Sequence, residues 1–170
     1  MNASGKNPKS KNSHNAQRTA ARLAAVQAVY QMMANDQRAA AVFDDLRTRP
    51  PGDGLDGGAQ MVAPDAALMS AIIDGVEERG DDLMRLITGA QNRRNSTVDD
   101  TNPPQLSPIE PLLRSILLCG SFELLAHHET DVPLIISDYL EVTHAFYDQG
   151  ESKLVNGILD KISKSVRDNG

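Results

Sequence analysis

Few side chains in this sequence are placed for covalent or metal chemistry. His127 and His128 are adjacent, and neighbouring residues on a helix diverge by about 100°, so this pair cannot hold one ion. No other Cys/His grouping has ligand spacing, and no metal site is expected. The motifs of serine hydrolases, zinc proteases, P-loop enzymes and CxxC redox proteins do not occur. The sequence therefore predicts a protein that is not an enzyme and needs no cofactor.

Residues 52–58 contain a literal G-x-G-x-x-G pattern. A dinucleotide site of this kind needs a preceding strand, and Asp53 and Asp56 would repel a pyrophosphate. A calcium loop is excluded because Pro64 stands where the bidentate glutamate would fall. We interpret residues 49–64, and also residues 95–106, as flexible loops.

The charge distribution indicates a binding function more clearly. The chain has 17 cations and 23 acids, for a net charge of −6, but its first 22 residues hold no acid. The five cations there are Lys6, Lys9, Lys11, Arg18 and Arg22. A basic arm on an acidic body can contact nucleic-acid phosphates, although a solvated tail without a partner explains the same pattern. Residues 1–15 have little to bury and are expected to be disordered in the free protein.

The elements that must position any site are helices. The apolar stretch 112–125 is too short for a membrane span, and its apolar residues fall on every side of a helical wheel. This pattern predicts a central buried helix, in which Gly120 lets another helix approach closely. A helix can start either at Ser107, which opens a capping box, or at Pro111.

Six further helices are expected around this central one. With it, the seven predicted helices span about 16–34, 36–48, 65–79, 81–94, 107–128, 131–147 and 152–167. Asp65 and Ser152 are candidate N-caps, and Gly80 separates the third helix from the fourth. No strand pattern is present, so the predicted fold class is all-α. We expect a compact seven-helix bundle of two lobes around the central helix, forming one domain over residues 16–170.

The compartment can also be predicted. No run could cross a bilayer, and the N-terminus lacks the apolar region of a secretory signal. The single cysteine, Cys119, lies in the apolar stretch and suits a reduced, buried side chain. These features predict a cytoplasmic protein that does not interact with membranes.

Three segments, 21–30, 117–124 and 154–161, carry a resemblance to a known family. Together with Asp131-Val132-Pro133 and the helix 135–146, and in this order, they resemble the NusB family of transcription antitermination factors. The resemblance implies an RNA-binding protein that pairs with NusE, a small-subunit ribosomal protein, and binds boxA of nascent transcripts. It also implies association with RNA polymerase, NusA and NusG, suppression of termination, notably on ribosomal RNA operons, and no binding to DNA.

The resemblance further implies a set of site residues. Those expected to bind RNA are Arg18, Arg22, Gln27, Tyr30, Lys153, Leu154 and Asn156. Those expected at the protein partner are Glu110, Arg114 and Glu123, for which ordinary exposed helix surface is the alternative. For Tyr30 the alternative is a place in the core, which its apolar neighbours favour.

The chain departs from the family at several of these positions. Thr19 and Ala20 stand where relatives often add arginines, and Leu118 stands where many carry arginine. Leu154 replaces a usual phenylalanine, which removes a ring that could stack on a base for about 1–3 kcal/mol. The tail lysines are expected to compensate through phosphate contacts.

Two other functions fit the same features. One is an RNA-docking module related to rRNA methyltransferases, since domains of this family occur fused to such enzymes. Against this alternative, a chain that stops at residue 170 is expected to leave no room for a methyltransferase domain. The other is a helical protein-protein scaffold without RNA binding, in which the basic arm would be incidental.

Overall fold

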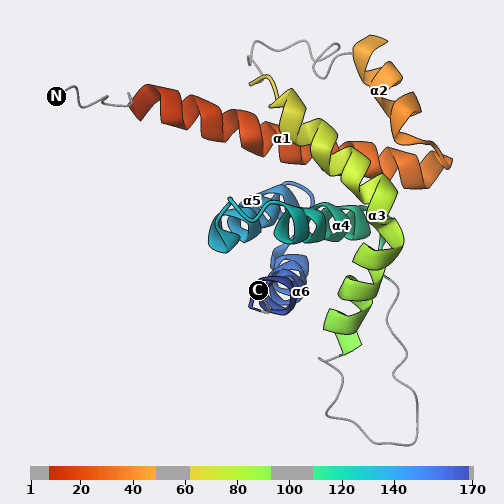
Figure 1. Cartoon of the computed structure of the whole chain (residues 1–170), viewed down its shortest axis with the longest axis vertical. Helices are drawn as coiled ribbons and strands as arrows, with labels where there is room; N and C mark the ends of the chain where they lie inside the picture. Colours follow the sequence, from red (N-terminus) through yellow and green to blue (C-terminus); the bar gives the residue numbers. More distant parts are fainter. Residues whose placement is uncertain (1–7, 49–61, 93–108, 169–170) are drawn as a thin grey trace, which may run out of the picture.

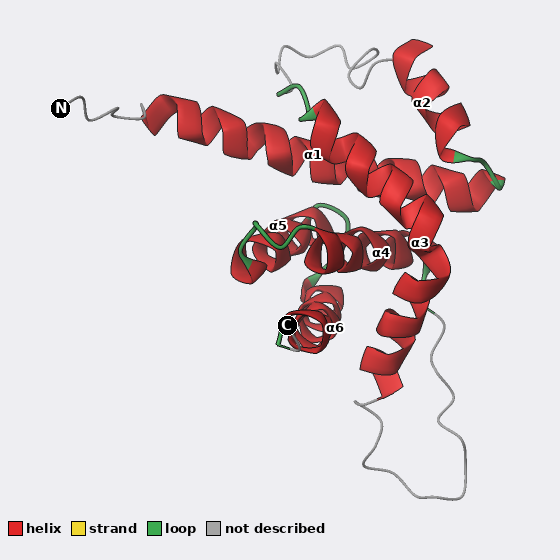
Figure 2. Cartoon of the chain, viewed as in Figure 1, coloured by secondary structure: helices red, strands yellow, loops and turns green. Residues whose placement is uncertain are grey.

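The computed structural model describes residues 8–48, 62–92 and 109–168. These ranges form six helices and no strand, which confirms the predicted all-α class (Figure 2). The helices are α1 (Pro8–Asn35), α2 (Ala39–Thr48), α3 (Ala66–Asn92), α4 (Pro111–Ala126), α5 (Val132–His144) and α6 (Gln149–Arg167). None of these helices is long and apolar enough to cross a membrane.

The difference from the seven predicted helices lies in α3. The predicted interruption at Gly80 is found one residue earlier, at Arg79, whose φ of −114° and ψ of 15° are not helical. The third and fourth predicted helices are joined across this kink and together form α3. Its predicted N-cap is confirmed, because Asp65 Oδ1 accepts a hydrogen bond from the Leu68 backbone at 3.0 Å.

Helix α1 is longer than expected and begins at Pro8 instead of about residue 16. Residues 11–15 are exposed, and this end of the helix projects past the rest of the molecule (Figure 1). At the other end Asp36 adopts a left-handed conformation with φ of 52°, and the Gln37 N–H bonds to the Met32 carbonyl at 3.0 Å. This arrangement is a Schellman motif, which stops α1 and turns the chain into α2.

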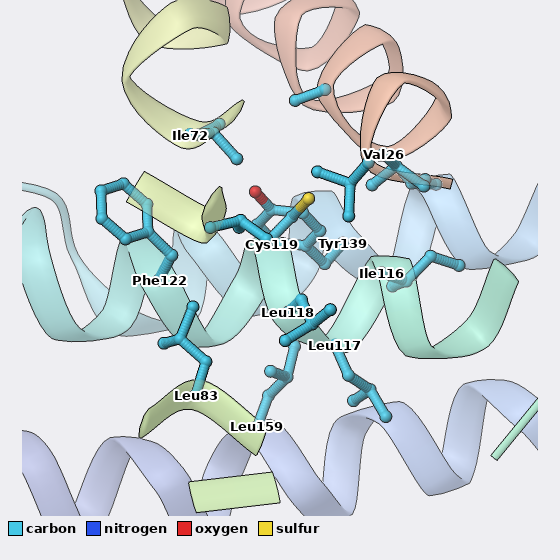
Figure 3. Packing of buried hydrophobic residues seen from close by; sticks show 14 of the residues in the cluster. Val26, Ile72, Leu83, Ile116, Leu117, Leu118, Cys119, Phe122, Tyr139 and Leu159 are labelled. Atoms are coloured by element: carbon cyan, nitrogen blue, oxygen red, sulfur yellow. The ribbon is translucent and has the colours of Figure 1, made fainter. Parts of the chain in front are cut away.

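Helix α4 is the predicted central helix. It is buried almost continuously from Leu113 to Leu124 and contacts α1, α3, α5 and α6. Figure 3 shows its side chains between Val26 and Ile72 on one side and Leu159 on the other. Its first residue is Pro111, and Glu110 caps it by accepting hydrogen bonds from the backbones of Leu112 and Leu113, both at 3.3 Å.

Small residues let the neighbouring helices approach α4. A Cβ atom on Gly120 would lie 3.0 Å from Leu159 of α6, which confirms the predicted close approach. The ends of α5 and α6 were predicted less well. Asp131 precedes α5 as expected, but α6 begins at Gln149, so Ser152 lies within α6 and is buried and not a cap.

Two glycines of α3 give a matched test of this packing. A Cβ atom on Gly75 would lie 2.0 Å from the Phe122 ring, whereas one on Gly89 would meet nothing within 4 Å. Gly75→Ala should therefore lower the free energy of unfolding by about 1–3 kcal/mol, the usual cost of overpacking. Gly89→Ala should raise it by up to about 1 kcal/mol, because alanine is the better helix former. Urea unfolding of both variants measures the contrast, and equal effects would contradict this packing.

Candidate functional site

The exposed edge of α1 carries two of the predicted RNA-binding residues. Gln27 and Tyr30 are three positions apart, so they share one side of the helix, and both are exposed. The Tyr30 side chain is 41% exposed, which places its ring on the surface and not in the core. These two residues together offer a ring face and an amide to a ligand.

Arg18 lies on another side of α1. It is nine residues before Gln27, and at 100° per residue the two side chains point about 180° apart. Arg18 is half-buried, and its Nη2 atom lies 3.4 Å from the hydroxyl of Thr130 in the α4–α5 turn. The structure therefore does not bring Arg18 together with Gln27 and Tyr30.

The predicted RNA-binding residues of α6 lie in a third, separate region of the surface. Lys153 and Asn156 are exposed, whereas Leu154 is half-buried and packs against the core. Helix α6 contacts α3, α4 and α5, and α4 lies between it and α1 (Figure 1). Any ligand that uses both α1 and α6 must therefore span α4.

Two of the predicted partner residues lie together at the start of α4. Glu110 is exposed and accepts a hydrogen bond from the Tyr147 hydroxyl, and this bond lowers the pKa of Glu110. Arg114 follows one turn later, is half-buried, and donates from Nη2 to the Ile109 carbonyl at 3.2 Å. Its Nε is buried without a hydrogen-bond partner in the part of the chain that the structure describes.

Glu123 and Arg22 are the main correction to the predicted site. Their side chains are 0% and 1% exposed, so neither faces a ligand on the surface. Arg22 donates to both carboxylate oxygens of Glu123, at 2.7 and 2.9 Å, and to Asp138 at 2.6 Å. The Tyr139 hydroxyl donates to Glu123 at 2.7 Å. This buried cluster joins α1, α4 and α5.

The chemistry of the cluster keeps Glu123 ionised. Burial alone would favour the neutral acid, but the nearby His127, the hydrogen bonds from Arg22 and Tyr139 and the charge of Arg22 outweigh it. Together they lower the pKa of Glu123 from 4.5 to about 2. The His127 Nδ1 atom is 3.5 Å from the carboxylate and does not have hydrogen-bond geometry, so Arg22 and Tyr139 hold Glu123 most directly.

This lowered pKa predicts a specific acid sensitivity. A carboxylate with a depressed pKa in the folded state stabilises the fold above its unfolded pKa, and this contribution disappears as the pH falls. The native chain should lose on the order of 3 kcal/mol from this group between pH 5 and pH 2. In urea unfolding, the difference in the free energy of unfolding between the native chain and Glu123→Gln should shrink as the pH falls across this range. An advantage that is constant with pH would contradict the ionised state of Glu123.

Sequence reasoning missed the partners of these residues. Asp138 and Tyr139 of α5, and Arg167 of α6, had no assigned role in a site, because each contacts atoms at least 16 residues away in the chain. One signal was available, since Glu123 stands between Phe122 and Leu124 within an apolar run and a buried acid needs a cation. Across the described residues, no group of three or more side chains could hold a metal ion.

These features define the class of the protein as an all-helical one with the NusB fold. The structure is similar to that of a NusB from T. maritima, with a TM-score of 0.64 at 19% sequence identity. The similarity covers 89% of this chain and 94% of that chain. At this level of identity it establishes the fold.

The sequence establishes the family. The NusB family model matches residues 19–164. Relatives from Rhizobium rhizogenes and Sinorhizobium medicae, both named transcription antitermination protein NusB, are 39% and 38% identical over 151 residues. Each match covers 89% of this chain and 88% of the relative. The chain belongs to the NusB family.

Proposed function

We propose that this chain is an RNA-binding transcription antitermination factor. With NusE it would bind boxA of nascent transcripts and suppress termination, notably on ribosomal RNA operons. The family match over residues 19–164, which includes the exposed Gln27 and Tyr30, is the observation that carries the proposal. In this role the chain works in the cytoplasm with RNA polymerase, NusA and NusG, and needs no DNA, membrane, cofactor or catalytic step.

Two sides of α1 offer different contacts to RNA. Lys11 on the projecting end and Arg18 beside the α4–α5 turn can contact phosphates, which fixes the position of a strand without reading its sequence. The Tyr30 ring can stack on an unpaired base, and Gln27 can hydrogen-bond a base edge. Arg22 has no direct part in this scheme, because it is buried.

Residues of α6 and of the start of α4 provide the other contacts in this proposal. Lys153 and Asn156 would contact RNA beyond the segment bound to α1, since α4 separates the two places. Leu154 can add only apolar contact there. Glu110 and Arg114 at the start of α4 would face the protein partner, whereas Glu123 is buried and would not.

Tyr30 provides the sharpest test of the base contact. Tyr30→Ala should weaken binding of a boxA oligonucleotide by about 1–3 kcal/mol, the contribution of one stacked base. Tyr30→Phe keeps the ring and should bind within about twofold of the native chain, because stacking does not need the hydroxyl. Fluorescence anisotropy with a labelled oligonucleotide measures both affinities.

Met33 is the matched control for this experiment. It is 36% exposed on the same helix, so Met33→Ala shortens a side chain of similar exposed fraction without removing a ring. Met33→Ala should leave RNA affinity unchanged. Equal affinities for Tyr30→Ala and the native chain would remove Tyr30 from the proposed interface.

A further inference from the structure

The α4–α5 turn, residues 127–131, is braced from α6 by one arginine. The Arg167 guanidinium donates to the carbonyls of Leu124 at 2.7 Å and His127 at 2.8 Å. It also donates to the carbonyls of His128 and Thr130, both at 3.3 Å. The Leu124 carbonyl belongs to the last turn of α4 and the other three to the turn that follows, where the His127 carbonyl also accepts the Thr130 backbone N–H at 3.1 Å. Arg167 therefore adds to the capping of α4 by its C-cap residue, His127.

The same turn supports Arg18 from the other side. Thr130 is buried, and its hydroxyl is 3.4 Å from the Arg18 Nη2 atom. Thr130 thus meets Arg167 through its carbonyl and Arg18 through its side chain. Helices α1 and α6 do not touch each other, so within the described residues this turn is a direct polar route between them.

We infer that Arg167 is a positioning residue for Arg18. Arg167 fixes the carbonyls of the α4–α5 turn and so holds Thr130 where the Thr130 hydroxyl orients the Arg18 guanidinium. This contact uses one of the five donors of Arg18 and leaves four for a phosphate group. The inference rests on the proposed function, because it takes RNA phosphate as the ligand of Arg18. It assigns to the end of α6 a part in RNA binding that requires no contact between Arg167 and RNA.

A double-mutant cycle tests this inference in the full chain with a boxA oligonucleotide. Arg18→Ala should weaken binding about three- to tenfold, as expected for the loss of one phosphate contact. Arg167→Gln and Thr130→Val should each weaken binding about two- to fivefold when Arg18 is present, and should have no further effect in the Arg18→Ala background. Lys164→Ala, which removes an exposed cation of α6 paired with Asp160, is the control and should not change affinity.

The outcomes separate the inference from the proposed function. Losses of equal size in both backgrounds would show that Arg167 and Thr130 act independently of Arg18, and would overturn the inference. No effect of Arg18→Ala, with Tyr30→Ala still harmful, would also overturn it and leave the proposed function standing. Absence of boxA binding by the native chain would instead overturn the proposed function. If Arg167→Gln does not fold, Arg167→Lys takes its place, because lysine keeps the charge but has fewer donors for the four carbonyls. A loss of equal size in both Arg18 backgrounds would then overturn the inference in the same way.

Discussion

Replacing Glu123 by glutamine should lower the free energy of unfolding by about 3–5 kcal/mol, because the buried Arg22 loses the carboxylate that accepts two of its hydrogen bonds and keeps only Asp138 as a charge partner. Arg22 is 1% exposed, so water cannot take the place of the lost carboxylate. Arg22→Met should cost a similar amount, since it leaves the carboxylate of Glu123 uncompensated. Urea unfolding at pH 7 measures both variants.

A double variant of the buried pair and a single variant of a surface ion pair are the controls for these stability measurements. Arg22→Met with Glu123→Gln should cost clearly less than the sum of the single changes, because neither buried charge then remains. Arg38→Gln breaks the ion pair with Glu77 on the surface, where Arg38 is 85% exposed, and should cost less than about 1 kcal/mol. If Glu123→Gln lowers the free energy of unfolding no more than Arg38→Gln does, the buried cluster does not stabilise the packing of α1 against α4 and α5.

Removing residues 1–15 should reduce boxA affinity by about 100-fold at 0.1 M salt, with the loss fading toward 1 M. The segment holds Lys6, Lys9 and Lys11, and each phosphate contact contributes a slope of about 0.7 to the salt dependence of binding to a single strand. The slope should therefore flatten by about 2. Binding titrations of the truncated and full chains from 0.05 to about 1 M salt measure this difference.

The structure sets where this truncation must stop. Ala21 and Arg22 are buried, and the Gln17 carbonyl accepts the Asp65 backbone N–H at 3.0 Å, so a longer deletion would remove part of the core. Residues 11–15 are exposed, and the truncated chain should keep the thermal stability of the full one. If the truncated chain keeps the salt dependence of the full chain, Lys6, Lys9 and Lys11 do not contact the RNA.

The central helix and the fold class could be predicted because they depend on local pattern. The apolar run 112–125 has no polar side, which leaves enclosure by other helices as the way to bury it. The predicted interruption at Gly80 is found one residue earlier, as a kink at Arg79 that divides α3 into two helical stretches. Glycine weakens a helix at such a point, and Ile72 before the kink and Leu83 after it are both buried.

The site was predicted less completely, for a physical reason. Arg22 follows Arg18 by one turn and both were expected to bind RNA, yet Arg22 contacts Glu123 and Asp138, about a hundred residues away in the chain. Charge type does not distinguish a cation that meets phosphate from one that meets a buried acid. The apolar neighbours of Tyr30 favoured a place in the core, and only the family resemblance pointed to a surface role, yet its side chain is 41% exposed. Gln27 is exposed on the same side of the helix.

The most direct measurement is a titration of the full chain with a labelled boxA oligonucleotide, with and without the NusE ribosomal protein, against a scrambled oligonucleotide of equal length. We predict that the chain binds boxA more tightly than the scrambled RNA, and more tightly still when NusE is present. Binding of neither RNA in the presence of NusE, or equal binding of both, would contradict the proposed function.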